Sequence, residues 1–263
     1  MSSSAYDVDG LVFVVAGGTT GMGLSGAELL VANGARLVVY SRSEENVAAA
    51  LERLGAKARG IVGDAGDPVT AEAAVKMAVQ TWGRVDGLYH VAGGSGRSKG
   101  DGPLHELTNE GWDYTMELNL SSVVYSNRAV MRQLLAQQEG GVILNMSSVL
   151  GWSPSPKYFG SHAYAAAKAG IIGLSKAAAA SYASANIRVN VIAPALVETP
   201  MSARARDNEL IMEYVARKQP LDGGRIGVPD DVDGAAAFLL SRAARFITGQ
   251  VLAVDGGWTS AEG

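Results

Sequence analysis

The 263-residue sequence contains no cysteine, which excludes disulfide bonds and metal sites built on thiolates. It has only three histidines, His90, His105 and His162, and their wide separation predicts no metal-ligand cluster. It also lacks an excess of basic residues, because 22 lysines and arginines face 26 acidic residues and the net charge is -4. Such a chain has no overall basic field for nucleic acid. We therefore expect neither a metal site nor nucleic acid as a partner.

Long hydrophobic runs are missing as well. No stretch reaches the roughly 18 apolar residues of a membrane-spanning helix. The first residues, Met-Ser-Ser-Ser-Ala-Tyr-Asp, lack the basic segment and apolar run of an export leader. The sequence thus predicts a soluble, cytoplasmic protein that does not bind membranes.

What is abundant is glycine, with 33 residues, and apolar side chains, which make up 48% of the chain. Buried strands alternate with helices without a linker or a shift in composition, so residues 1–263 are expected to form a single domain. This alternation predicts an α/β fold: a doubly wound, Rossmann-type parallel sheet of about seven strands in a three-layer α/β/α arrangement. Strands are predicted at 11–16, 36–40, 59–63, 85–92, 142–146, 188–193 and 251–254. Helices are predicted at 22–33, 44–54, 68–82, 163–183 and 230–241, with a long helix or broken pair over 108–138 and a short helix around 207–217.

A glycine-rich turn, Gly17-Gly-Thr-Thr-Gly21-Met-Gly23, joins the first predicted strand to the first helix. Glycine tolerates positive φ and lets the backbone approach a pyrophosphate, whose charge is met by free N–H groups at the helix N-terminus. The segment from Gly21 to Gly26 offers a second glycine register, but the first follows the strand directly and is preferred. Gly26 then lets the helix pack closely on the sheet. The predicted dinucleotide-binding residues of this turn are Gly17, Thr19, Thr20, Gly21, Met22 and Gly23.

The second predicted strand ends in Tyr40-Ser41-Arg42, where an NAD-binding fold would carry an acidic residue for the ribose hydroxyls. Ser41 and Arg42 can instead donate hydrogen bonds to a 2′-phosphate. NADP(H) is therefore favoured over NAD(H). The alternative is that Arg42 is an ordinary surface cation.

Tyr164 and Lys168 stand four residues apart in a predicted helix and so share one face. A nearby ammonium group favours the phenolate, so we expect Lys168 to lower the pKa of Tyr164 toward the working range of an acid or base. Short motifs of this kind also match by accident, and the alternative is that the two are ordinary residues of an alanine-rich helix.

Several motifs in a fixed order give the chain a resemblance to the short-chain dehydrogenases/reductases, from Leu11 to Trp258, and to their 3-oxoacyl-(acyl-carrier-protein) reductase-like members. The glycine turn, Asp64, the Ala92-Gly93 half of His90-Val-Ala-Gly, Asn119, Ser148, Tyr164 and Lys168 match the family pattern. His90 stands where the family usually has asparagine, and Ala195 where it usually has glycine.

The resemblance implies roles for these residues. Asp64 and Ala65 meet the adenine ring, Ala92 and Gly93 pass close to the cofactor, and Tyr164 and Lys168 contact it as well. A further cofactor-binding segment comprises Pro194, Ala195, Val197 and Thr199. The implied catalytic residues are Asn119, Ser148, Tyr164 and Lys168. Ser147 competes with Ser148, and the second serine of the pair usually carries the role in the family.

The implied activity is that of an NADP(H)-dependent oxidoreductase, a ketoreductase interconverting a small-molecule carbonyl and a secondary alcohol. Alternatives are an NAD(H)-dependent alcohol dehydrogenase of the same family, a non-catalytic dinucleotide-sensing protein, and an isomerase or dehydratase. Trp152, Tyr158 and Phe159 in the loop before Tyr164 either wall the substrate pocket or are subunit-interface or plain packing residues. Residues 195–225 are expected to form a substrate loop or lid, and the C-terminal strand implies a homo-oligomer, a homotetramer by default.

Overall fold

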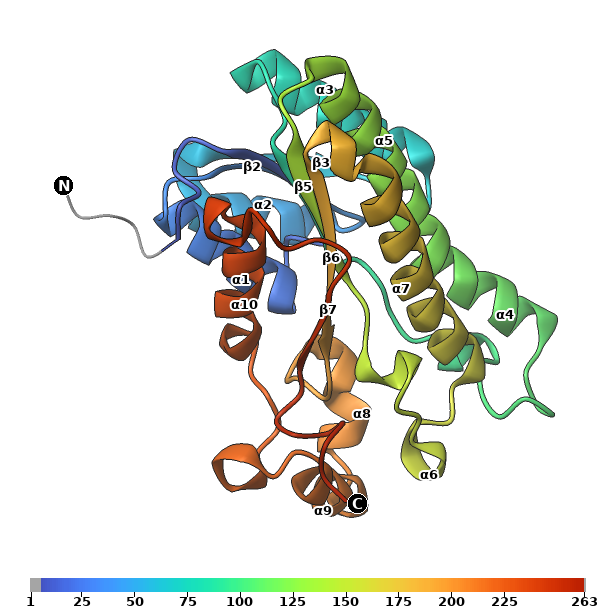
Figure 1. The fold of residues 1–263 in the computed structure, drawn as a ribbon. Helices are drawn as coiled ribbons and strands as arrows, with labels where there is room; N and C mark the ends of the chain where they lie inside the picture. The colour runs from blue at the N-terminus through green and yellow to red at the C-terminus, as the bar shows by residue number, and fades with distance from the viewer. Residues whose placement is uncertain (1–5, 263) are drawn as a thin grey trace.

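A computed structural model describes residues 6–262, so residues 1–5 of the segment considered for an export leader, and Gly263, lie outside it. Its centre is one seven-stranded parallel sheet in the order β3-β2-β1-β4-β5-β6-β7 (Figure 1). The doubly wound fold expected from the sequence is confirmed. The strands are β1 Val12–Ala16, β2 Arg36–Ser41, β3 Ala58–Val62, β4 Gly87–His90, β5 Gly141–Met146, β6 Ile187–Pro194 and β7 Val251–Val254.

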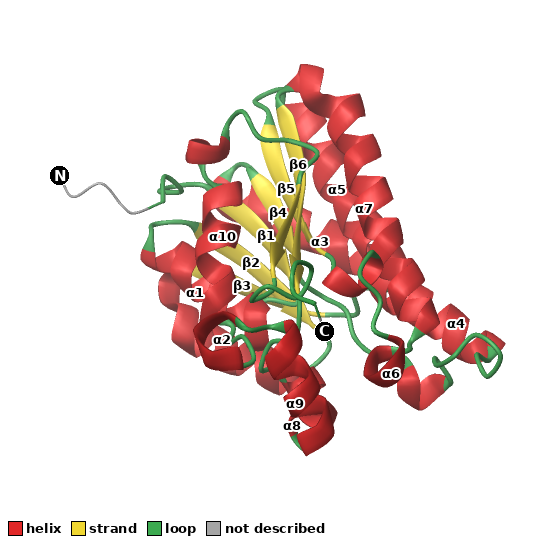
Figure 2. Ribbon diagram, turned by 60° about the horizontal axis from the view of Figure 1, so that its bottom comes forward, coloured by secondary structure: helices red, strands yellow, loops and turns green. Residues whose placement is uncertain are grey.

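Helices cover both faces of the sheet and give three layers (Figure 2). One face carries α1 (Gly21–Ala32), α2 (Glu44–Leu54) and α10 (Asp230–Leu240). The other carries α3 (Pro68–Trp82), α5 (Ser122–Gln137) and α7 (His162–Tyr182). Such double coverage requires central strands that are apolar on both sides.

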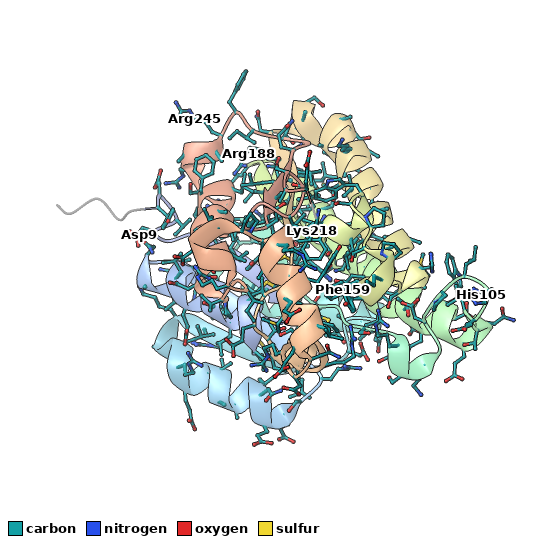
Figure 3. The ribbon with its side chains drawn as sticks, turned by 90° about the horizontal axis from the view of Figure 1, so that it is seen from below. Asp9, His105, Phe159, Arg188, Lys218 and Arg245 are labelled. Atoms are coloured by element: carbon teal, nitrogen blue, oxygen red, sulfur yellow. The ribbon has the colours of Figure 1, made fainter. Side chains whose placement is uncertain are left out.

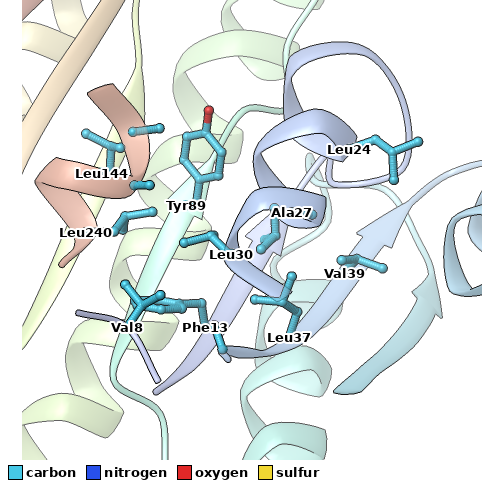
Figure 4. Close-up of a cluster of buried hydrophobic side chains, with 14 of the residues drawn as sticks. Val8, Phe13, Leu24, Ala27, Leu30, Leu37, Val39, Tyr89, Leu144 and Leu240 are labelled. Atoms are coloured by element: carbon cyan, nitrogen blue, oxygen red, sulfur yellow. The ribbon is translucent and has the colours of Figure 1, made fainter. Parts of the chain in front are cut away.

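β1 illustrates this requirement, since all five of its residues are buried. Successive side chains point to opposite faces. Phe13 and Val15 join the core under α1 and α10, while Val12, Val14 and Ala16 join the core under α3 and α5. Figure 4 shows the first of these cores around Phe13 and Tyr89. A Cβ atom at Gly26 would lie 2.8 Å from the Tyr89 ring, so glycine lets α1 pack close to the sheet, as expected.

One predicted strand differs from the observed one, and one alternative that the sequence left open is decided by the structure. The strand expected over 85–92 is shorter, because the N–H groups of Val91 and Ala92 both bond to the Ala16 carbonyl as the chain leaves the sheet. The segment over 108–138 is continuously helical, with α4 (Asn109–Met116) and α5 joined through a π-helical turn at Glu117–Ser121. Turns of this kind are frequent at functional sites.

The carboxyl ends of the strands are covered by short elements, α6 (Pro156–Phe159), α8 (Ala203–Arg206) and α9 (Glu209–Lys218), which gather near the C-terminus (Figure 1). They enclose a small separate core that includes Val149, Val215 and Trp258. Ligands of open α/β sheets bind at these carboxyl ends, where the strand order reverses between β1 and β4. Within residues 6–262, no helix is long and apolar enough to span a membrane.

Candidate functional site

A pocket opens at the carboxyl ends of the strands. Its walls come from segments as far apart in the chain as Met22 in α1 and Trp258 near the C-terminus. Ten of the predicted site residues line it or reach into it: Met22, Gly93, Ser148, Tyr164, Lys168, Pro194, Ala195, Val197, Thr199 and, as the alternative serine, Ser147. The fold thus brings together side chains that the sequence separates by more than 170 residues, on the order of a whole domain.

Tyr164 lies in the first turns of α7, half-buried, with its side chain on the pocket wall. Burial raises the pKa of its phenol to about 12, and a hydrogen bond with Ser148 opposes this rise only in part. The spacing of Tyr164 and Lys168 led us to expect the opposite direction. That expectation is wrong for the protein alone, because loss of hydration disfavours the phenolate more than the neighbouring groups favour it.

Lys168 is almost fully buried one turn further along α7. Its Nζ atom donates a hydrogen bond to the Met146 carbonyl at 3.1 Å and lies 5.4 Å from the centre of the Tyr164 ring. Burial lowers its pKa to about 8. Lys168 forms no ion pair with any residue in the range 6–262, so this ammonium group is held by a single carbonyl beside the phenol.

The two competing serines have different surroundings. The Ser147 hydroxyl donates to the Lys168 carbonyl at 2.8 Å and so ties the end of β5 to α7. The Ser148 hydroxyl accepts from the Leu150 N–H at 3.2 Å, lies 3.5 Å from the Pro194 carbonyl, and is the one that reaches Tyr164. The geometry therefore places Ser148, rather than Ser147, next to the phenol.

Asn119 sits in the π-helical turn and is completely buried. Its amide clamps the backbone of Gly94, accepting from the N–H at 3.1 Å and donating to the carbonyl at 2.9 Å. It also donates to the Thr115 carbonyl. A Cβ atom at Gly93 would lie 2.8 Å from the Asn119 oxygen and 3.3 Å from the Lys168 nitrogen, so glycine is needed where this loop passes both residues. The water-holding role implied for Asn119 stays a prediction.

The glycine turn has the form that a pyrophosphate requires. Gly17 adopts a φ of +75°, and a Cβ atom there would lie 2.8 Å from the Ala92 nitrogen. A Cβ atom at Gly23 would overlap the Gly17 carbonyl oxygen. α1 begins at Gly21 with no acidic residue in its first turn, which leaves its N–H groups and positive dipole end open to an anion. These residues fit a dinucleotide.

The residues predicted to bind the adenosine end of the cofactor lie at or just after the ends of β2 and β3 and in the glycine turn. The Thr19 hydroxyl, behind the glycine turn, donates to the Ser41 hydroxyl at 2.8 Å. Arg42 extends into solvent, and its Nη1 atom lies 3.9 Å from the Asp64 carboxylate, which itself accepts from the Gly66 N–H. Arg42 thus lies at the surface beside the residue predicted to meet the adenine ring, and its role toward a 2′-phosphate stays a prediction. Thr20 precedes α1 as its N-cap, and Ala65 is partly buried against the core.

The segment after β6 faces the glycine turn. A Cβ atom at Gly21 would lie 3.3 Å from the Thr199 methyl group, so the two predicted cofactor-binding segments are in contact range. Val197 forms an isolated bridge with Gly227. Ala195, which replaces the usual glycine, is not among the described residues with positive φ, so alanine is tolerated there.

The aromatic residues of the loop before Tyr164 divide between the two alternatives. Phe159 lines the pocket and packs edge-on against Trp258, with ring centres 5.7 Å apart. Tyr158 packs on Tyr214 of α9 instead, and Trp152 is 43% exposed. Figure 3 shows Phe159 near the middle of this end of the molecule and His105 at its edge. Among the described residues, no three histidine, aspartate or glutamate side chains are grouped as metal ligands.

His90 replaces the usual asparagine and is completely buried beneath the pocket. Its Nδ1 atom lies 2.7 Å from the Ser126 hydroxyl, and its Nε2 atom lies 3.1 Å from the Ala92 carbonyl. Because a carbonyl can only accept, Nε2 carries the proton in the neutral ring. Burial, and secondarily the Lys168 charge, lower the pKa of His90 to about 3. His90 therefore remains neutral and fixes the Ala92 backbone next to the glycine turn.

Asp101 is a site residue that the sequence did not reveal. Its carboxylate accepts hydrogen bonds from the backbone N–H groups of Ala163 and Tyr164, at 3.0 and 3.1 Å, and so caps α7 from a separate loop. The N-cap residue Ser161 makes no such bond with its own side chain. Helix-capping signals are sought within a few residues in the sequence, and this cap comes from more than 60 residues away.

We expect Asp101→Ala to lower both stability and turnover. Losing an N-terminal cap costs about 1–2 kcal/mol, which corresponds to a fall in Tm of about 3–6 °C for a chain of this size. Because the cap holds the Tyr164 backbone, kcat should fall as well. Asp67→Ala is the matched control, since Asp67 caps α3 through the Val69 N–H. It should lower Tm similarly and leave kcat at saturating cofactor unchanged. Equal kcat in the two variants would contradict the positioning role.

Comparison with known proteins agrees with this arrangement. A family model described as enoyl-(acyl carrier protein) reductase matches residues 16–259. A cis-4-hydroxycyclohexanecarboxylate dehydrogenase from Sinomonas cyclohexanicum is 36% identical over 95% of this chain and 96% of its own length. The 3-oxoacyl-(acyl-carrier-protein) reductase of Escherichia coli strain K12 is 35% identical over 95% of this chain and 97% of its own. A solved short-chain type dehydrogenase/reductase from Mycobacterium ulcerans superimposes with a TM-score of 0.89 at 31% identity, covering 98% of this chain and 92% of that one.

Proposed function

Because the chain belongs to the short-chain dehydrogenase/reductase family, an oxidoreductase family, we propose that it is an NADP(H)-dependent enzyme interconverting a carbonyl and a secondary alcohol. The observation that carries this proposal is the convergence of Ser148, Tyr164 and Lys168 on one wall of a pocket whose rim includes the segment facing the glycine turn. The relatives' names support the reaction class, since one is a dehydrogenase of a ring alcohol and another a reductase of a 3-oxo group.

A bound nicotinamide cofactor would supply or accept the hydride. The glycine turn and the N-terminus of α1 would hold its pyrophosphate, and Pro194, Ala195, Val197 and Thr199 would line the nicotinamide end. In the direction of reduction, the Tyr164 hydroxyl donates a proton to the substrate oxygen while the Ser148 hydroxyl stabilises its developing negative charge. Lys168 holds a positive charge beside the phenol and favours the phenolate that results. Asn119 fixes the loop at Gly93 and Gly94 against Lys168.

The raised pKa of Tyr164 bears on how the rates of the two directions depend on pH. A phenol with a pKa of about 12 is protonated at neutral pH and ready to act as an acid, which carbonyl reduction requires. Oxidation of an alcohol needs the phenolate. We therefore propose that the rate of alcohol oxidation rises with pH.

The test is a panel of ketones offered with NADPH, followed through the loss of reduced-nicotinamide absorbance. It includes 4-oxocyclohexanecarboxylate, the ketone that corresponds to the substrate named for one relative, and a 3-oxoacyl thioester. An enoyl thioester is added because of the family model's description. The proposal is supported if the ketones are reduced and the enoyl thioester is not. Cofactor binding without turnover of any compound would instead indicate a dinucleotide-sensing protein, and conversion without net cofactor consumption an isomerase or dehydratase.

The cofactor preference rests on Arg42 and Ser41. We expect Arg42→Ala to raise the KM for NADPH by about 10-fold or more, the loss typical for a charge-assisted bond to phosphate, and to change the KM for NADH little. Arg53→Ala is a control on the next helix, because Arg53 is paired with Glu28. A lower KM for NADH than for NADPH in the unmodified enzyme would contradict the preference and favour the NAD(H)-dependent alternative.

We also propose that residues 195–225 form a movable cover over the pocket, since Met201, Ser202 and Arg204 of this segment line it. The homotetramer implied by the family resemblance stays a proposal. Light scattering tests it directly, and a monomer mass would remove it.

A further inference from the structure

Two arginines, Arg97 and Arg204, meet at the mouth of the pocket. Arg97 lies in the loop after β4, and Arg204 lies in α8, after β6. The Nη2 atoms of both donate to the same acceptor, the Tyr158 carbonyl, at 3.4 and 3.2 Å. Three loops from different strands therefore join at one oxygen, and the two guanidinium groups lie within a few ångströms of each other.

This pair of cations has no carboxylate partner. In the described part of the chain, neither Arg97 nor Arg204 forms an ion pair, whereas Arg206 on the same short helix is paired with Glu198 at 2.6 Å. Asp101 is the acidic group near Arg97, but its carboxylate is committed to the backbone N–H groups of α7. Burial and the charge of Arg204 both lower the pKa of the Arg97 guanidinium, as expected for two like charges close together.

Each guanidinium also has donors to spare. Arginine carries five N–H groups, and the single bond to the Tyr158 carbonyl uses one of them. Two adjacent guanidinium forks are well suited to a carboxylate or phosphate, which they can bind through two or more parallel hydrogen bonds. An anion placed there would also relieve the repulsion between the arginines.

The pocket also contains a second polar region besides the two arginines. Its lining is largely apolar, and Ser148 and Tyr164 provide hydroxyl groups for a carbonyl. A substrate that satisfies both regions must carry its ketone or alcohol at one point and an anionic group at another. We propose that Arg97 and Arg204 form an oxyanion-binding subsite, and that the enzyme acts on carbonyl compounds or secondary alcohols bearing a carboxylate or phosphate. This substrate class rests on the proposed oxidoreductase function.

The experiment compares pairs of compounds that share the ketone and the carbon skeleton, of which one member carries an anionic group and the other is neutral. Levulinate, 5-oxohexanoate, 6-oxoheptanoate and 4-oxocyclohexanecarboxylate are each measured against their methyl esters, and dihydroxyacetone phosphate against dihydroxyacetone. Because the linear acids differ in chain length, the best of them reports the separation between the two regions. We expect kcat/KM to favour the charged member of at least one pair by about 10- to 100-fold, and added salt to reduce this preference. A preference in the carboxylate pairs or in the phosphate pair shows which of the two anionic groups the subsite binds.

The variants are Arg97→Gln, Arg204→Gln and the double variant. Glutamine retains a donor for the Tyr158 carbonyl, so the loops should keep their positions. The double variant should lose the preference for the charged member, so that its kcat/KM for each acid falls to about its kcat/KM for the corresponding methyl ester. Arg206→Gln is the matched control and should keep the preference. Calorimetric binding of hexanoate, which cannot be reduced, gives a second readout and should weaken by a similar factor in the double variant.

The two proposals fail in different ways. If the neutral ketones are reduced but no charged member is favoured, or if the double variant keeps the preference, the anion subsite is wrong and the oxidoreductase function stands. If no ketone is reduced, the proposed function fails, and hexanoate binding then decides the subsite: equal affinity of unmodified protein and double variant, or no binding to either, would overturn it.

Discussion

Replacing Tyr164 with phenylalanine is expected to lower kcat by about 10³-fold, within the range typical for removal of a positioned general acid. The variant keeps the ring, which lies 5.4 Å from the Lys168 nitrogen, and removes only the hydroxyl that reaches Ser148. The glycine turn and the Arg42 region are untouched, so the dissociation constant for NADPH should change no more than a few-fold. Stopped-flow turnover and fluorescence titration of the cofactor measure the two quantities separately.

Tyr182→Phe is the control for this variant. Tyr182 is the last residue of α7 and packs against the core between the sheet and the helices α3 and α5. It is not among the residues that line the pocket. It should leave kcat unchanged. Wild-type turnover in Tyr164→Phe would remove Tyr164 from the mechanism.

The second large effect is expected at Lys168, where activity and stability should move in opposite directions. Lys168→Met keeps the volume of the side chain and removes the charge, so kcat should fall by at least 10²-fold, the lower end for loss of an acid–base group's support. Stability should rise near pH 7, because the folded protein no longer carries a buried ammonium group. The pKa of Lys168 is about 8 in the folded protein against 10.5 for an exposed lysine. This difference in pKa corresponds to a gain of roughly 3 kcal/mol in the free energy of unfolding when the charge is removed. The loss of the hydrogen bond to Met146 reduces this gain by about 1 kcal/mol.

The sign of the pH dependence follows from the lowered pKa. Below about pH 8 the folded and unfolded states both bind the proton, and the folded state bears the full cost of the buried charge. Between pH 8 and 10.5 the folded state releases the proton while the unfolded state keeps it, so wild-type stability rises relative to the variant. The stability advantage of Lys168→Met should therefore be largest below pH 8 and shrink as the pH increases. Urea unfolding at several pH values tests this, and an advantage that grows with pH would contradict the buried-ammonium explanation.

Local patterns predicted the frame of the site well. The apolar run ending at Ala16 and the glycines from Gly17 to Gly23 are contiguous in the sequence, so their strand–turn–helix geometry is encoded within a few residues. Tyr164 and Lys168 share a helix for the same reason. Helical and extended periodicities are properties of short segments and can be recognised without knowing the fold.

Contacts between distant segments could not be predicted in this way. The cap that Asp101 provides for α7 and the meeting of Arg97 with Arg204 depend on how separate loops lie over the sheet. The pKa of Tyr164 shows a related difficulty. Spacing identified the cation beside the phenol, but the direction of the pKa shift is decided by burial, which depends on the complete pocket.

The position of Trp258 has a consequence for how the pocket stays closed. This residue is buried against Phe159 and Tyr214, and Lys218 lies over its ring. These contacts join the loop before Tyr164, the helix α9 and the segment after β7 in a small core that is separate from the two cores of the sheet. A local opening that breaks this small core would therefore uncover the pocket while the sheet and its two cores stay folded.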